Sequence, residues 1–282
     1  EQNQGHFILQ WGYEVRQRLF NSVDQAMGPS SSGLLKSLIF GDRTELNEST
    51  ETAFRRSGVM HVLAVSGLHL GILIGLFFGI FRALRISFTG TYLLLVPIVL
   101  VYLVLVGFKL SLVRASMMLG FAALGWMIAE RGWILRRWVD PLQGLSLAAL
   151  IILIWTPAAL FDVSFQLSFG ATAGILLALE LFGPKLNIWR SRLEHGWNAS
   201  GSAFKKRAAK LAYGFAIFLL ISLAAQIAVT PILGLQFDEL HLTALLANVV
   251  VVPLATLAIW VSVAFLIFAQ ILAELSLYIA QL

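Results

Sequence analysis

The sequence predicts an all-α membrane protein, built as a polytopic helical bundle of about seven spans. Of its 282 residues, 59% are hydrophobic and only 12% are charged, whereas about a quarter of the residues of a soluble domain are charged. The apolar residues stand in long blocks, and a helix needs about 20 such residues to cross the hydrocarbon core. The basic residues gather between alternate blocks. A soluble, cytosolic or disordered protein is therefore excluded.

Seven apolar blocks are candidates for the spans. They cover residues 59–81, 91–107, 111–129, 142–155, 163–182, 211–235 and 242–272. The fourth block is short for a full crossing, and the seventh is long. We expect a broken helix near Pro253, with a half-helix at 242–252 before the true span, because proline removes a backbone donor and clashes with the preceding turn.

Residues 1–58 differ from the rest of the chain, since they mix acidic and basic side chains and contain no block long enough to span. Phe7, Trp11, Val15 and Leu19 recur every four residues, which predicts an amphipathic helix. Such a helix lies in the membrane interface or packs on the bundle, and the pattern supports both equally. A second short amphipathic helix is expected after the turn-rich stretch 27–33.

Basic residues predict the orientation, because cytoplasmic loops carry an excess of Lys and Arg. If the first span runs inward, the cytoplasmic loops contain Arg82, Arg85, Arg131, Arg136, Arg137, Lys185, Arg190, Arg192, Lys205, Lys206, Arg207 and Lys210. The opposite short loops contain only Lys109 and Arg114. The expected organisation is an extracytoplasmic or interfacial segment at 1–58, membrane helices 1 to 5 at 59–182, a basic cytoplasmic linker at 183–210, and membrane helices 6 and 7 at 211–282.

Four glycines on the first span share one face of the helix, at Gly67, Gly71, Gly75 and Gly79. A strip without side chains lets another helix approach closely, so the spacing favours helix packing. A hinge, or a place where a ligand touches the backbone, is the alternative.

Two polar stripes recur at the same four-residue spacing on the fifth and sixth spans. They consist of Ser164, Ser168 and Thr172, and of Ser222, Gln226 and Thr230. In hydrocarbon such groups need partners or water, so the stripes indicate interhelical hydrogen bonds or the wall of an aqueous path. Gln166 and Asn248 are further candidates for buried amides.

Charged residues near the span ends have two interpretations each. Arg114 follows Lys109 by five residues at the start of the third span, where a cation snorkels to the interface or contacts a polyanion. Asp162 opens the fifth span, where a carboxylate caps the free backbone amides of a helix or belongs to the polar path.

His61, Ser66 and His69 form a polar group at the start of the first span. A nucleophile needs a base oriented by a third group, and no carboxylate is near in sequence. A zinc site needs a third ligand. Polar lining or buried hydrogen bonding is therefore the expected role. The stretch Gly28 to Gly33 resembles a phosphate-binding loop, but its Lys-Ser pair arrives two residues late. No catalytic residue, metal site or cofactor is predicted.

The run from Phe54 to His69 resembles the signature of the ComEC family, the DNA-internalisation competence proteins of bacteria. Other stretches resemble that family's ordered landmarks, namely Phe40-Gly-Asp-Arg43, Ser111-Leu-Val-Arg114, Asp140-Pro141, Pro157, Asp162 to Phe169, Asn248 and Pro253-Leu254. Together they cover nearly the whole chain, and the resemblance is specific.

This resemblance implies a multi-pass domain of the bacterial cytoplasmic (inner) membrane that conducts single-stranded transforming DNA during natural competence. It implies that His61, Ser66, His69, Arg114, and Asp162 with Gln166 to Ser168, belong to the path. It also implies partners: an extracytoplasmic DNA receptor, a cytoplasmic helicase-like ATPase, and flanking oligonucleotide-binding and metallo-β-lactamase-like domains. Nuclease activity is expected only in the latter, so this chain is expected not to be an enzyme and to be a piece of a longer protein.

A DNA path should be wet, mildly positive and free of deep cation traps, and the stripes and sparse cations suit it. The competing class is a secondary transporter for a small solute, whose site would lie between repeats or at broken helices. No repeat is visible, although Pro253 offers one break. A structural scaffold would show glycine packing without a need for polar stripes.

Overall fold

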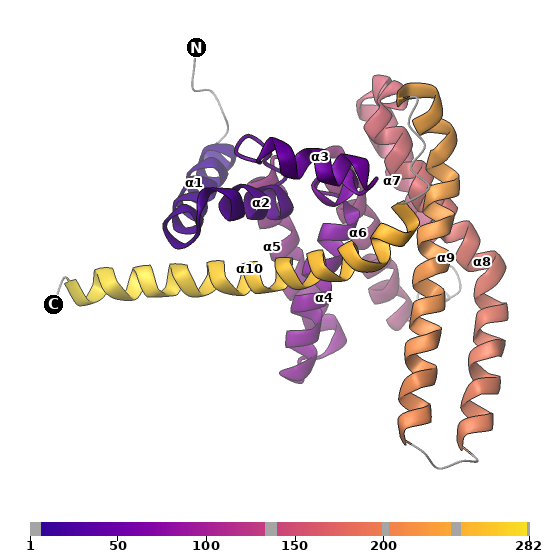
Figure 1. Cartoon of the computed structure of the whole chain (residues 1–282). Helices are drawn as coiled ribbons and strands as arrows, with labels where there is room; N and C mark the ends of the chain where they lie inside the picture. The colour runs from indigo at the N-terminus through magenta and orange to yellow at the C-terminus, as the bar shows by residue number, and fades with distance from the viewer. Residues whose placement is uncertain (1–6, 133–139, 199–202, 238–243, 281–282) are drawn as a thin grey trace. The chain divides into compact units, whose positions relative to one another are not determined.

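The computed structural model describes residues 7–132, 140–198, 203–237 and 244–280, which are largely helical and contain no strand. The predicted all-α membrane fold is thus confirmed. The chain divides into two compact units, Glu1–Trp138 with Val250–Leu282 (unit 1) and Val139–Val249 (unit 2). The helices drawn in Figure 1 are α1 Phe7–Ala26, α2 Pro29–Phe40, α3 Glu48–Arg56, η1 Met60–Val62, α4 Gly67–Ala83, α5 Phe88–Val106, α6 Leu110–Glu130, α7 Pro141–Trp155, η3 Pro157–Phe161, α8 Val163–Asn198, α9 Ala203–Phe237 and α10 Ala244–Ala280.

Five of the described helices are long and apolar enough to cross a membrane, at Phe88–Val106, Leu110–Ala129, Val163–Arg192, Arg207–Gln236 and Ala244–Gln270. Two of the predicted blocks form shorter apolar helices, Gly67–Ala83 and Pro141–Trp155. A 17-residue helix rises only about 25 Å. The structure therefore contains a helix for each predicted block, with five of them long enough to span by this measure.

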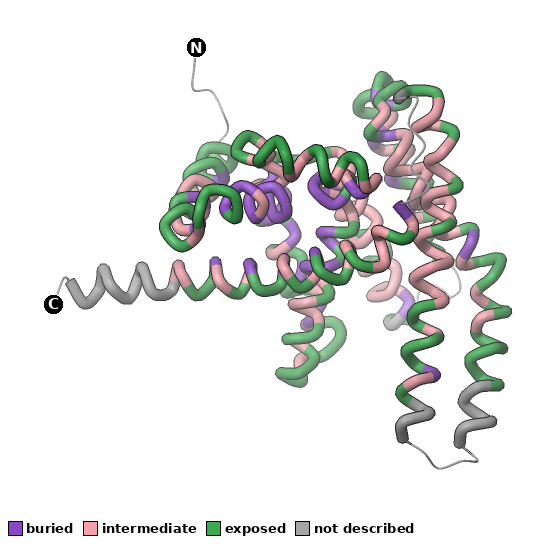
Figure 2. Tube along the Cα trace, viewed as in Figure 1, coloured by how far each residue is buried: buried purple, intermediate pink, exposed green. Residues whose placement is uncertain are grey.

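The core of unit 1 joins the N-terminal helices to one end of α4, α5 and α6. Phe20 of α1 and Phe40 of α2 pack with Leu70, Leu103 and Leu112. The Tyr102 hydroxyl donates to the Ile39 carbonyl at 2.8 Å. In Figure 2 the buried residues concentrate in α2 and the segments around it. Residues 7–58 are thus anchored on the three helix ends.

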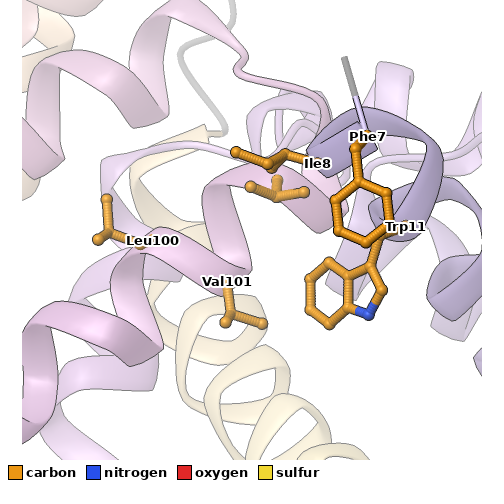
Figure 3. Close-up of a pocket in the computed structure, with 6 residues that line it drawn as sticks. Phe7, Ile8, Trp11, Leu100 and Val101 are labelled. Atoms are coloured by element: carbon orange, nitrogen blue, oxygen red, sulfur yellow. The ribbon is translucent and has the colours of Figure 1, made fainter. Parts of the chain in front are cut away.

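The pattern of α1 allows an interfacial helix or a helix packed on the bundle, and the two halves of α1 differ in this respect. Phe7 and Trp11 in its first half are 82% and 41% exposed, whereas Phe20 and Val23 in its second half are buried. A β-carbon at Gly12 would collide with the side chain of Val104, so α1 crosses α5 in direct backbone contact. Its first half borders an apolar groove of about 370 Å³, lined by the residues in Figure 3: Phe7, Ile8, Trp11, Leu100, Val101 and Val104.

Unit 2 consists of α7, η3 and the long hairpin of α8 and α9, which lie side by side (Figure 1). Small residues around Gly174 make a close contact between the two hairpin helices. A β-carbon at Gly174 would lie 2.5 Å from Ala228 Cβ and 3.0 Å from the Ala224 carbonyl oxygen. Close backbone approach through glycine and alanine is the usual way that helices associate where no hydrophobic force drives them together.

One sequence expectation is wrong, and the secondary structure of another segment is now described. Helix α10 runs without interruption through Pro253, so the predicted break is not present. In an apolar environment the remaining backbone hydrogen bonds have no water to compete with them, and the helix tolerates the missing donor. The predicted linker at 183–210 is largely helical, because α8 continues to Asn198 and α9 begins at Ala203.

Candidate functional site

The candidate site lies in unit 1, where α4 begins, α5 ends and α6 begins. The turn from α5 to α6 is tight: Gly107 and Phe108 adopt positive φ angles of 82° and 55°. Lys109, which follows them, donates from its ammonium group to the Gly41 carbonyl at 3.0 Å. The loop after α2 is thereby held against the α5–α6 turn.

Gly41 is required at this junction for two reasons. Its φ of 66° ends α2 in the left-handed region, which favours glycine. A β-carbon there would lie 2.9 Å from Val65 Cγ2 and would also collide with the ammonium group of Lys109. The loop therefore packs tightly on both the start of α4 and the start of α6.

Ser66 and His69 form a capping box at the N-terminus of α4. Ser66 Oγ accepts from the Leu68 amide at 3.3 Å, and His69 Nδ1 accepts from the Ser66 amide at 3.3 Å. His69 is fully buried and lies within electrostatic range of His61 and Lys109. The structure therefore brings His61, Ser66, His69 and Lys109 together, and the capping contacts explain why α4 starts at Gly67 rather than at residue 59.

Arg114 belongs to the same end of unit 1. It is 6% exposed, and its Nη2 atom would lie 3.1 Å from a β-carbon at Gly67, with Ala115 Cβ at 3.2 Å. Gly67 therefore lets α4 approach α6 at this point, which is a packing role. Five of the predicted polar residues thus converge from α4, α6 and the segments just before them.

The structure adds three residues to this group that the sequence analysis assigned no role. Arg16 of α1 pairs with Asp42 at 2.5 Å. Asp42 Oδ1 also accepts from the amide and the hydroxyl of Thr44, at 3.1 and 2.6 Å. Arg43 follows in the same loop and lies within electrostatic range of Lys109. We call Arg16, Asp42, Arg43 and Lys109 the cationic loop cluster.

A second charged group fastens α1 to α2 and to the loop after α2. The Lys36 ammonium is buried and pairs with Asp24 at 2.7 Å and with Glu45 at 2.6 Å, and Ser32 donates a hydrogen bond to Asp24. Burial alone would lower the pKa of Lys36, but the hydrogen bonds to both carboxylates outweigh it and raise the pKa. The role of Lys36 is structural.

The remaining glycines of the predicted strip lie on an open surface. Gly71, Gly75 and Gly79 are exposed, and a β-carbon at each would meet nothing within 4 Å among the described residues. A packing role for these three stays a prediction. Helix α10 does contact α4 next to the strip, where Trp260 Nε1 donates to the Ile72 carbonyl at 3.1 Å.

The α8–α9 hairpin does not bring the two polar stripes together. Gly170 and Gly174 are the residues of α8 that face α9. Ser168 and Thr172 each lie two positions from one of these glycines, which is about 200° around the helix axis. The stripe on α8 therefore points away from the contact with α9. The same offset separates Ser222, Gln226 and Thr230 from the alanines that face α8. Thr172 and Thr230 donate to the carbonyls of Ser168 and Gln226 in their own helices. A shared wet interior therefore stays a prediction.

Of the other predicted residues of unit 2, Asp162 and Gln166 have local hydrogen-bond partners. Asp162 accepts from the Ser164 amide at 2.7 Å and caps α8. Gln166 donates from Nε2 to the Leu160 carbonyl at 3.0 Å, which ties α8 to η3. The Asn248 side-chain oxygen is buried and has no hydrogen-bond partner within the described part of the chain.

Fold and site together define a polytopic helical membrane protein with a group of cations and histidines at one end of three helices. Among the residues that the structure describes, no group of three or more His, Asp or Glu side chains is placed to hold a metal ion. The family model described as "Competence protein" matches residues 38–282. The chain belongs to this family.

Curated relatives agree with the family match. The chain is 27% identical to ComE operon protein 3 of Bacillus subtilis over 87% of its own length and 27% of that protein. It is 28% identical to Recombination protein 2 of Haemophilus influenzae over 87% of its own length and 29% of that protein. Competence protein ComA of Neisseria gonorrhoeae is 30% identical over 60% of the chain and 25% of that protein. The chain thus spans less than a third of these relatives, and no solved structure matches it.

Proposed function

We propose that this chain is a membrane domain that conducts a single strand of transforming DNA across the bacterial cytoplasmic membrane. The observation that carries the proposal is the family match over residues 38–282. The names of the matched relatives refer to competence and recombination, and both processes involve DNA.

The geometry of the candidate site supports the same activity. Lys109 and Arg114 flank the start of α6, and the histidines lie beside them, all at the end of unit 1 that the loop charges predict to be outside. A strand entering there meets positive charge before it meets the hydrocarbon-spanning helices. Because each nucleotide carries one phosphate, such a mouth attracts nucleic acid at long range.

The proposal extends to partners. No nucleotide-binding loop was found in the sequence, so the pulling force would come from a cytoplasmic helicase-like ATPase, and an extracytoplasmic receptor would deliver the strand. Flanking oligonucleotide-binding and metallo-β-lactamase-like domains would complete the protein, and degradation of the other strand would occur in the latter. A small-solute permease is less well supported, since the break at Pro253 that favoured it is not present in α10.

Uptake of labelled DNA by competent cells tests the proposal. Cells whose full-length protein carries Lys109→Gln should internalise less DNA than wild type, and the deficit should narrow as salt is raised, because a protein with one fewer phosphate contact loses less affinity to salt. The control is Arg55→Gln, which removes an exposed cation of α3 that pairs with Glu51. The proposed function would be rejected by either of two results. One is undiminished DNA uptake in cells that lack the protein, and the other is import of a neutral solute, but not of DNA, through the protein.

A further inference from the structure

The loop that carries the cationic loop cluster is fixed at both ends. On one side, the Gly41 amide donates to the carbonyls of Lys36 and Ser37. On the other, the Leu46 amide donates to the Arg43 carbonyl at 3.1 Å. Thr44 is held to Asp42 by two hydrogen bonds. The backbone that carries Arg43 is therefore preorganised, which reduces the entropic cost of binding a ligand.

Three cations from three segments meet a single carboxylate in this cluster. Arg16 comes from α1, Arg43 from the loop and Lys109 from the start of α6. Within the described part of the chain, the ion-pair partner of Asp42 is Arg16. Among the residues that the structure describes, Lys109 donates to a neutral carbonyl, that of Gly41. The guanidinium of Arg43 makes no hydrogen bond or ion pair with any residue that the structure describes. Positive charge therefore exceeds negative charge in the cluster.

Burial and the excess positive charge of the cluster lower the pKa of Lys109. Desolvation by its neighbours lowers the pKa of Lys109, and the positive charges of Arg43 and Arg16 lower it further, while Asp42 acts in the opposite direction. Cations that repel one another at a fixed site are stabilised when an external anion binds between them. The cluster is half-exposed, so such an anion can reach it.

The chemistry of the side chains selects the class of anion. A guanidinium presents a planar set of donors that matches two oxygens of a phosphate, and Lys109 adds a point charge. Asp42 reduces the net charge of the cluster, which limits affinity. A site of this kind suits an anion that must bind and then leave, such as successive phosphates of a moving strand.

We propose that Arg43, Arg16 and Lys109 form a binding station for the phosphodiester backbone of a single nucleic-acid strand, with Asp42 as the internal counterion that keeps the strand from being trapped. This inference rests on the proposed function and deepens it by naming the residues that first hold the strand. Because Lys109 also lies near His69, a strand on the station is adjacent to the polar group at the start of α4.

Binding of a fluorescently labelled single-stranded oligonucleotide to the full-length protein in phosphatidylcholine nanodiscs tests the station. Arg43→Gln should weaken binding about threefold to tenfold and reduce the slope of log K against log salt by about 0.7, the value for one lost phosphate contact on a single strand. Arg43→Lys should restore most of the slope but not the full affinity, since it keeps the charge and loses the planar donors. Arg55→Gln is the matched control and should change neither.

Asp42→Asn separates binding from loop structure. The amide oxygen can still accept from Thr44, so the loop keeps its shape while the counterion is lost, and oligonucleotide binding should tighten about twofold to fivefold. A residue that only supported the loop would weaken binding when it was replaced. Equal affinities for Arg43→Gln and Arg55→Gln, or weaker binding by Asp42→Asn, would overturn the station.

Two further results distinguish the station from a lipid-binding site and from a failure of the proposed function. If Arg43→Gln lowers retention of phosphatidylglycerol in nanodiscs of mixed lipid and leaves oligonucleotide binding unchanged, the cluster binds a lipid headgroup and the proposal is wrong. If Arg43→Gln binds the oligonucleotide normally while Lys109→Gln cells still lose DNA uptake, the station fails but the proposed function stands. If wild-type protein is dispensable for uptake, the proposed function itself fails.

Discussion

The two units of this protein use polar side chains for different purposes. In unit 1 they join segments distant in sequence, as when the Tyr102 hydroxyl donates to the Ile39 carbonyl. In the α8–α9 hairpin of unit 2, a polar contact joins the helices, from the Tyr213 hydroxyl to Asn187 Oδ1 at 2.7 Å. Elsewhere in the hairpin, Thr172 donates to the carbonyl of Ser168 one turn earlier, and small residues such as Gly174 make the close contact between helices.

This difference predicts that unit 1 positions charged groups, whereas the hairpin depends mainly on close packing of its helices. A hydrogen bond or ion pair between distant segments fixes the position of both groups, so unit 1 can hold charges in a defined arrangement. A hydroxyl that bonds to its own helix satisfies itself and orients nothing else. We therefore expect substitutions in unit 1 to act through charge, and substitutions in the hairpin to act through shape.

The largest effect on stability is expected when Lys36 loses both counterions. The double variant Asp24→Asn with Glu45→Gln leaves an ammonium buried without a partner, which costs about 3–5 kcal/mol. Thermal unfolding of the purified protein in detergent measures the loss. Glu51→Gln, which removes only the partner of the exposed Arg55, should cost less than about 1 kcal/mol. Equal melting temperatures would mean that Lys36 does not hold unit 1 together.

The hairpin should respond to volume instead. Gly174→Ala places a β-carbon 2.5 Å from Ala228 Cβ and should destabilise the protein by about 1–3 kcal/mol through overpacking. Gly183→Ala in the same helix meets nothing within 4 Å and should stabilise it by about 0.5–1 kcal/mol through helix propensity. If both variants shift the melting temperature in the same direction, small-residue packing does not explain this hairpin.

The charged network of unit 1 also predicts a pH profile. Hydrogen bonds from Lys36 and then from Ser32 lower the pKa of Asp24 below 3.8, so its stabilising effect is present above pH 3.8 and is lost as pH falls through the lowered value. The pKa of Lys36 is raised, so the stabilisation that this ammonium contributes is fully present below pH 10.5 and is lost as pH rises through the folded pKa. Melting temperatures from pH 3 to 11 should show this plateau, and Asp24→Asn should flatten its acid side.

The smallest effect is expected at the start of α8. Asp162→Ala removes a helix cap and should cost about 1 kcal/mol, whereas Asp162→Asn keeps the acceptor and should cost only a few tenths. The two variants are compared by thermal unfolding and by DNA uptake. If Asp162→Asn folds normally but abolishes uptake, the carboxylate acts in the path and the cap is not its whole role.

Sequence patterns predicted the helices well and the site only in part. Apolar blocks mark spans because the bilayer imposes length and composition, and Ser66, His69, Lys109 and Arg114 stood out because polar residues are rare at such positions. The structure placed them together at one end of α4 and α6. Periodicity alone contains no information about which helix ends meet.

Other features could be found only in the three-dimensional structure. Lys36 lies in an otherwise apolar run, which was a usable signal for a buried charge, but its partners Asp24 and Glu45 follow no sequence rule. The glycine spacing at Gly71 and Gly75 predicted a contact that the described residues do not supply, whereas Gly174 makes one without any long repeat. The expected break at Pro253 rests on the helix propensity of proline in water. That propensity overstates the effect of proline in an apolar setting, so the prediction is wrong.

Because α1 crosses α5 directly, the position of the crossing along α5 gives the depth of α1 in the bilayer. Val104 lies two residues and Leu100 six residues before the end of α5 at Val106, or about 3 and 9 Å along the helix axis. With α5 upright across the hydrocarbon, the aromatic first half of α1 sits at that depth, which matches the roughly 5–10 Å to which amphipathic helices sink below the headgroups. The groove in Figure 3 would then be level with the upper acyl carbons. A side chain larger than glycine at position 12 would push α1 away from α5 and so from this depth.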